Sequence, residues 1–118
     1  MKFLTLYTPS TPRSGPPRPE EMAKMVAHMN ASFKSGVLVA TGGIMPSASG
    51  GVRATLNQGK FGVEDGPFQS KLQQAAGWAI LNVNSRDHLL EEVRKFLELA
   101  GDGESDVIEI MEAPRPEN

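Results

Sequence analysis

The sequence predicts one α+β domain, in which an antiparallel sheet packs against two helices. Two observations carry this prediction. Segments with helical periodicity begin after Pro19 and after Ser85, and they alternate with short strand-like segments. The strand-like segments 3–7 and 75–83 are apolar on both faces, as strands in the middle of a sheet are. A chain of 118 residues is long enough for one such core.

The first third of the chain predicts a strand, a helix and a second strand. Residues 3–7 are strand formers, and the run 8–19, rich in Pro, Ser and Thr, ends that strand. Pro19 suits the first turn of a helix that Gly36 closes. Residues 37–40 then form a short strand that ends or bulges at the glycines after it. The apolar stripe of the helix consists of Met22, Met25, Val26, Met29 and Phe33.

The rest of the chain predicts a hairpin, the long apolar strand, a helix and a last strand. Apolar and polar residues alternate through 52–63 on either side of a turn at 57–60, which indicates a one-sided hairpin. Ser85 caps the second helix, and Gly101 stands at its exit. Residues 106–111 form the last strand. The buried stripe of the second helix consists of Leu89, Val93, Phe96, Leu97 and Ala100.

This order is the split βαβ pattern of a ferredoxin-like βαββαβ domain with an inserted β-hairpin. Two helices can cover only one face of such a sheet. Leu4 and Leu6 point to one face, whereas Phe3 and Tyr7 point to the other, so the uncovered face is also apolar. A second copy of the same face is the simplest cover, and the sequence therefore predicts a homodimer.

Composition narrows the classes of function. The formal charge of −2 and the pI near 5.7 leave no basic stripe, so no nucleic-acid partner is expected. Without cysteine the chain forms no disulfide and no Cys-ligated metal site, and neither histidine has a second ligand at metal spacing, so no metal or cofactor is expected. No segment has the length of a signal peptide core or a membrane span, which predicts a cytoplasmic protein with no membrane partner. The domain is expected to span 1–113, with a flexible tail at 114–118.

The residues Asp65-Gly66-Pro67-Phe68 resemble the signature of the DGPF proteins, a branch of the YCII-related family. The resemblance covers nearly the whole chain and includes Gly43-Ile44-Met45-Pro46-Ser47, Gly77-Trp78 and Ala100-Gly101-Asp102-Gly103-Glu104. It implies a dimeric α+β-barrel built from ferredoxin-like halves. Most members have no assigned activity, one relative is a dehydrochlorinase of aromatic degradation, and some are linked to extracytoplasmic-function sigma factors.

The resemblance also concerns the position of a histidine in the first helix. The simpler YCII proteins carry a histidine early in the first helix, which is thought to pair with an aspartate in a proposed active site. The matching position in this sequence is close to Met25, and His28 lies about one turn further on.

The predicted catalytic residues are Asp65 and His28. Pro67 fixes one backbone angle and Gly66 can adopt conformations closed to other residues, so the turn holds the Asp65 carboxylate in position for acid or base work. The alternative is an Asx-type turn, in which Asp65 only caps its own loop. His28 flanks the apolar stripe and faces a cleft or the dimer seam, where it can shuttle protons; the alternative is a half-exposed surface histidine. Phe68 either walls a ligand cleft or anchors the loop.

The leading hypothesis is a small-molecule cleft beside the Asp65–Phe68 turn, bounded by Met45, Arg53 and Trp78, with Arg53 facing an anionic group of the substrate. Its chemistry would be a cofactor-independent proton transfer of the lyase, isomerase or dehydrohalogenase kind. The alternative is a non-catalytic binding or regulatory module, acting with an extracytoplasmic-function sigma factor, in which the turn is purely structural.

Overall fold

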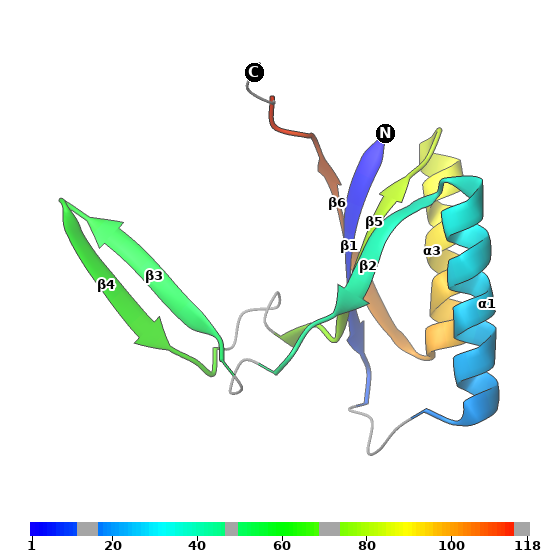
Figure 1. The fold of residues 1–118 in the computed structure, drawn as a ribbon, viewed down its shortest axis with the longest axis horizontal. Helices are drawn as coiled ribbons and strands as arrows, with labels where there is room; N and C mark the ends of the chain where they lie inside the picture. Colours follow the sequence, from blue (N-terminus) through cyan, green and yellow to red (C-terminus); the bar gives the residue numbers. More distant parts are fainter. Residues whose placement is uncertain (12–16, 47–49, 69–73, 115–118) are drawn as a thin grey trace.

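The computed structural model describes residues 1–11, 17–46, 50–68 and 74–114. It contains β1 (Lys2–Pro9), α1 (Pro19–Ser35), β2 (Leu38–Gly43), β3 (Val52–Asn57), β4 (Lys60–Asp65), β5 (Gly77–Asn82), α3 (Arg86–Ala100) and β6 (Gly103–Ile110). The fold is α+β, as predicted, with both helices on one face of a four-stranded sheet (Figure 1). Of the predicted tail 114–118, only the first residue lies within the described ranges.

The four-stranded sheet has the order β2-β5-β1-β6, and every neighbouring pair is antiparallel. The unit β1-α1-β2 leaves a gap that β5 fills, and the unit β5-α3-β6 leaves a gap that β1 fills. Two interleaved split βαβ units are compatible with a ferredoxin-like fold. β3 and β4 form a separate two-stranded sheet between β2 and β5 in the sequence.

The local signals for the helix ends are confirmed. α1 ends at Gly36, which has a φ of 84° and so occupies the left-handed region that favours glycine. The Ser85 hydroxyl accepts a hydrogen bond of 3.1 Å from the backbone N–H of His88 at the start of α3. β2 ends at the predicted glycines, but its register shift lies earlier, between Leu38 and Ala40.

The core lies between the helices and one face of the sheet. Its buried residues come from three strands, the segment after β5 and α3, and they are Phe3, Leu38, Leu81, Val83 and Leu89. Because side chains alternate along a strand, the neighbours of these residues point away from the helices. That open face of the sheet carries aligned apolar residues in adjacent strands, namely Ala40, Ile80, Leu4 and Ile108. The two-faced character predicted for the central strands is therefore present.

The predicted buried stripe of α1 is wrong at three of its five positions. Met25 and Met29 are half-buried, and Met22, Val26 and Phe33 are exposed. The five positions span an arc of about 100° around the helix, which is wider than the contact with one sheet layer. α1 is turned so that its buried residue is Ser32, on the other side of Met25 and Met29 from the exposed positions.

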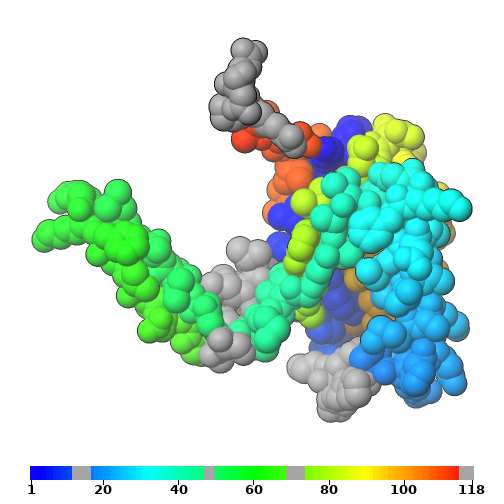
Figure 2. Space-filling model, viewed as in Figure 1, coloured from blue at the N-terminus to red at the C-terminus, as the bar shows by residue number. Residues whose placement is uncertain are grey.

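The chain is more extended than a compact domain of its size. Its radius of gyration is 16.8 Å, against about 13.5 Å expected for a compact chain of this length. Its accessible surface is 8977 Å², against roughly 6,200 Å² for a compact monomer of this mass. Figure 2 shows one cause: the β3–β4 hairpin stands away from the rest of the molecule, on the side opposite the helices. About 2,700 Å² of surface therefore exceeds what folding of a compact monomer would leave.

Candidate functional site

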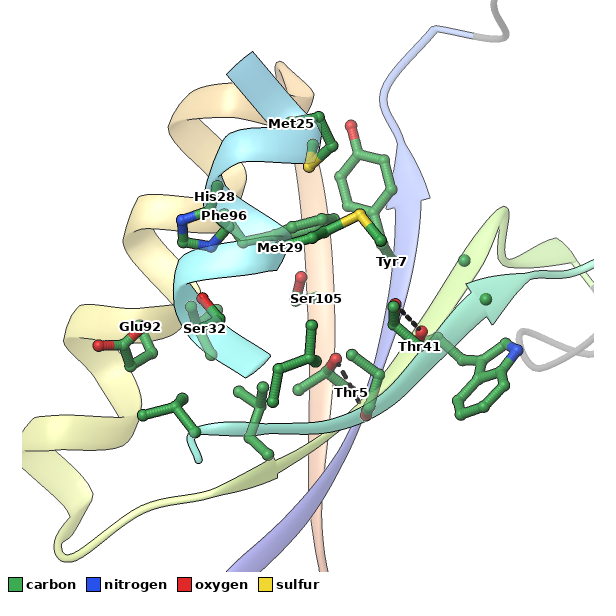
Figure 3. A pocket seen from close by; sticks show the side chains of 18 of the residues that line it. Thr5, Tyr7, Met25, His28, Met29, Ser32, Thr41, Glu92, Phe96 and Ser105 are labelled. Atoms are coloured by element: carbon green, nitrogen blue, oxygen red, sulfur yellow. Dashed lines mark hydrogen bonds between the residues drawn. The ribbon is translucent and has the colours of Figure 1, made fainter. Parts of the chain in front are cut away.

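A cavity of about 390 Å³ lies between the two helices and the helix-covered face of the sheet (Figure 3). Its lining is mainly apolar and aromatic, and includes Tyr7, Met25, Met29, Leu81, Val93 and Phe96. The volume falls in the range of small-molecule sites, which are concave, mostly apolar and supplied with a few polar groups. The polar groups that border this cavity decide what it can bind.

The two threonines on the floor of the cavity are already hydrogen-bonded. Thr41 Oγ1 donates to the backbone oxygen of Trp78 at 2.8 Å, and Thr5 Oγ1 donates to that of Ala79 at 3.4 Å (Figure 3). Both acceptors belong to β5, the strand between the two threonines. Their hydroxyl protons are therefore engaged within the sheet and do not point to a ligand.

His28 and Ser32 border the same cavity from α1 and are one helical turn apart, so both occupy one side of the helix (Figure 3). Ser32 is only 8% exposed, and His28 is half-buried. Neither side chain makes a hydrogen bond or ion pair with another residue in the ranges that the structure describes. Both side chains can therefore form a hydrogen bond with a polar group of a ligand in this mainly apolar cavity.

Glu92 borders the cavity from α3, and its largely buried carboxylate lies close to two side chains of its own helix. Its Oε1 atom lies 3.5 Å from Lys95 Nζ and 3.7 Å from His88 Nε2. Glu92 thus closes the helix side of the cavity as part of a charged cluster.

Tyr7 and Phe96 form an aromatic wall at one end of the cavity. Their rings meet edge to face with centroids 5.4 Å apart, and the Tyr7 hydroxyl donates to the backbone oxygen of Gly101 at 3.1 Å. The same wall borders a second, wider cavity of about 930 Å³, which also shares Met25 and Gly77 with the first. The two cavities are therefore neighbours along α1.

The predicted Asp65–Phe68 turn lies at the base of the β3–β4 hairpin. Asp65 is exposed, pairs with Val52 in the register, and forms no hydrogen bond or ion pair with any described residue. The Gly66 N–H donates to the backbone oxygen of Gly51 at 2.8 Å, and the Gly66–Pro67 peptide bond is cis. Gly66 does not share the positive φ of the described glycines at helix ends and the hairpin turn, so the expected special conformation is not found there.

The other residues of the predicted cleft do not lie together in one place. The Arg53 guanidinium lies 4.5 Å from the centroid of the Phe68 ring and 3.8 Å from Glu64 Oε2, so it is held within the hairpin base. Phe68 is buried. Met45 is 74% exposed. Pro67 borders the second cavity, and Trp78 is among the residues that border the first, although its indole lies on the open face of the sheet beside Gly42.

The structure therefore separates the two predicted catalytic residues. His28 lines the first cavity, whereas Asp65 lines neither of the two cavities described above. Sequence reasoning missed Ser32, which faces the cavity with His28. The available signal was their spacing of four residues beside an apolar stripe that is itself too wide to be buried whole.

Two features are absent from the residues that the structure describes. No three His, Asp or Glu side chains gather there in a group that could hold a metal ion. Neither α1 nor α3 has the length and apolar character needed to cross a membrane.

No protein-family model matches the chain, and no curated protein is significantly similar to it. The resemblance to the YCII-related proteins thus depends on the motifs themselves.

Proposed function

We propose that this protein is a YCII-related homodimer in which each subunit binds a small, mainly apolar molecule in the cavity between its helices and its sheet. The observation that carries the binding site is the pair His28 and Ser32, which border an apolar cavity without a partner from the described chain. Their free hydrogen-bonding groups call for a ligand with one polar group next to its apolar body.

The ligand class follows from the lining. Tyr7, Phe96 and the two methionines offer aromatic edges and polarizable sulfur, which suit a ring system. His28 and Ser32 can each donate or accept a hydrogen bond, which suits a hydroxyl or a carboxylate. Phenols and small aromatic carboxylic acids combine these features.

The enzymatic form of the proposal is a proton transfer that needs no cofactor. His28 is the group suited to it, because one nitrogen of an imidazole can accept a proton and the other can donate one, and the side chain lines the cavity beside a bound ligand. Ser32 orients the polar group of the ligand. Asp65 has no part in this step, since it lies at the hairpin base and not in the cavity.

The alternative is a non-catalytic binding or regulatory module, acting with an extracytoplasmic-function sigma factor. The observation that favours it is the separation of Asp65 from His28, which leaves the cavity without the predicted pair of acid and base. Ligand binding is common to both forms, and turnover distinguishes them.

The homodimer is supported by the open face of the sheet. Leu4, Leu6, Ile80 and Ile108 lie on that face, and Ile108 is 54% exposed. The surface in excess of a compact monomer is larger than the roughly 800 Å² that each partner buries in a standard interface. Packing two such faces against each other would give the dimeric α+β-barrel that the YCII resemblance implies, with the β-hairpin as an insertion in a ferredoxin-like βαββαβ unit.

The binding proposal is tested by thermal stabilisation with a panel of phenols and small aromatic acids. A ligand at a hundred times its dissociation constant adds about 2.7 kcal/mol, which raises the melting temperature by more than about 5 °C in a domain of this size. The shift should be lost in His28→Gln and reduced in Ser32→Ala. His88→Gln, which changes the other histidine outside the cavity, and Asp65→Asn should respond like the wild type.

Two results would contradict the proposed site. If His28→Gln keeps the full shift, the polar side of this cavity does not bind the ligand. If Asp65→Asn alone abolishes the shift, the site lies at the Asp65–Phe68 turn. Turnover of a bound compound by wild type but not by His28→Gln would establish the enzymatic form.

A further inference from the structure

The β3–β4 hairpin, residues 52–65, is an arm with one apolar and one polar face. Its register pairs Ala54 with Val63 and Leu56 with Phe61, so these four side chains share a face. The alternate positions pair Arg53 with Glu64 and Asn57 with Lys60 on the other face. An alternating pattern of this kind normally marks a sheet with one buried face and one in water.

In the single subunit the apolar face of the arm is not buried. Every residue of β3 is exposed, and near the tip Leu56 is 72% and Phe61 71% exposed. An isolated two-stranded hairpin is marginally stable in water, and gathered apolar residues on its surface mark an interaction site. The arm therefore lacks the partner surface that its pattern requires.

Among the residues that the structure describes, the contacts of the arm with the rest of the chain lie at its base. The Gly66 N–H donates to the Gly51 oxygen, and Arg53 packs over the ring of Phe68. From this base the arm projects on the side of the sheet away from the helices, and Figure 2 shows open space between the arm and the body of the subunit. The arm and the open face of the sheet thus border the same space.

The occupant that fits is a second copy of the chain. Each subunit has about 2,700 Å² of surface beyond that of a compact monomer, which is enough for the roughly 1,000–2,500 Å² that each partner buries in an obligate dimer. A second subunit that covers the open face of the sheet enters the space beside the arm. A two-fold axis then gives each subunit the same contact with its partner.

We propose that the arm of each subunit closes over the partner subunit, with the face of Ala54, Leu56, Phe61 and Val63 buried on the partner and the opposite face in water. This inference rests on the proposed homodimer but concerns a separate surface. It assigns the arm the role of a clasp, which adds to the contact between the two sheets.

The chain has no cysteine, so one introduced cysteine is its only thiol. Leu56→Cys places it on the apolar face of the arm, and Thr55→Cys places it one residue away on the polar face. The measurement is the rate of reaction with a maleimide, above and below the dimer dissociation constant that sedimentation gives for each variant. Leu56→Cys should react about tenfold more slowly in the dimer than after dilution, whereas Thr55→Cys should react equally fast in both.

The labelling and sedimentation results together distinguish failure of the clasp from failure of the homodimer. Equal and fast labelling of both variants in a dimer overturns the clasp and leaves the homodimer. Slow labelling of Leu56→Cys at every dilution also overturns it, because the arm then packs on its own subunit or on another molecule. A chain that is monomeric at all concentrations overturns the homodimer, and the clasp with it.

A second pair of variants covers the case in which the cysteine itself disturbs the arm. The double variant Leu56→Glu, Phe61→Glu should weaken dimerisation by about tenfold or more, because two large apolar side chains lose their burial. Thr55→Glu, Lys60→Glu on the polar face should leave the dissociation constant within about threefold. Equal constants for the two double variants would contradict the clasp.

Discussion

The indole of Trp78 lies so close to Gly42 on the neighbouring strand that a Cβ atom at position 42 would sit 2.8 Å from its Nε1 atom. The two residues are cross-strand partners, and Leu6 is the partner of Trp78 on the other side. Trp78 therefore belongs to the open face of the sheet, where glycine at position 42 makes room for the only tryptophan of the chain.

Replacing Gly42 by alanine should displace the indole, because the added methyl group overlaps three ring atoms. We expect a loss of about 1–3 kcal/mol in the free energy of unfolding and a shift of the tryptophan emission. Fluorescence-detected denaturation measures both. Gly43→Ala is the matched control, because its Cβ would meet only the Ala76 oxygen at 3.7 Å; an equal effect of the two changes would contradict the packing described.

The elements of the fold were predictable because their signals are local. Pro19, Gly36 and Ser85 mark helix ends through backbone geometry and capping, which neighbouring residues decide. Rotation of α1 was not predictable in the same way, since Met22 and Met25 are chemically equivalent in a sequence pattern. Which of them is buried depends on where the sheet lies.

The candidate site was also predictable only in part, because it depends on how α1 packs against the sheet. His28 was singled out, and it borders the cavity. Ser32 was missed, because its spacing of four residues from His28 does not show by itself that the packing places both side chains against a cavity. Asp65 drew attention through its turn, but the turn fixes the local chain path and not the distance to α1.

Ser32→Ala should separate stability from binding. Alanine has the higher helix propensity and removes a buried hydroxyl, so the free energy of unfolding should rise by about 0.5 kcal/mol while the ligand response falls. Thermal melts with and without ligand measure both effects. Asn30→Ala, at an exposed position inside the same helix, is the control for propensity, and a parallel fall in its ligand response would contradict the role of Ser32.

Ser85→Ala should destabilise the protein by about 1 kcal/mol, because the N–H of His88 loses its capping acceptor. Ser85→Asp should restore most of the loss, since aspartate accepts the same bond and also favours the positive end of the helix. Chemical denaturation measures the differences. If alanine and aspartate destabilise equally, the side-chain cap does not stabilise α3.

The ion pair between Lys2 and Glu112 predicts a small dependence of stability on pH. The hydrogen bond and then the charge of Lys2 hold the pKa of the Glu112 carboxyl below its usual value. A carboxyl whose pKa is lower in the folded state stabilises the fold above its unfolded-state pKa, and this contribution is lost as the pH falls through the folded pKa. Glu112→Gln should thus be slightly less stable than wild type near pH 7, and the difference should disappear at a pH well below the folded-state pKa of Glu112.

Both side chains of this pair are at least partly exposed, so high salt should also remove the difference. A difference that is independent of pH and salt would show that the substitution acts through something other than the ion pair.

Ile80 and Leu81 are neighbours in β5 on opposite faces of the sheet, and aspartate at the two positions should have different effects. Leu81 is in the core, so Leu81→Asp should unfold the subunit. Ile80 lies on the open face, so Ile80→Asp should leave a folded subunit and dissociate the proposed dimer. Circular dichroism reports the fold and sedimentation the association state.

Sedimentation equilibrium of the wild type at micromolar concentration is the most direct test of the proposed homodimer. The open face of the sheet and the extended surface of the subunit predict a species of twice 12.7 kDa, which Ile80→Asp converts to a folded species of 12.7 kDa. A wild type that sediments as a 12.7 kDa monomer over the whole concentration range would contradict it.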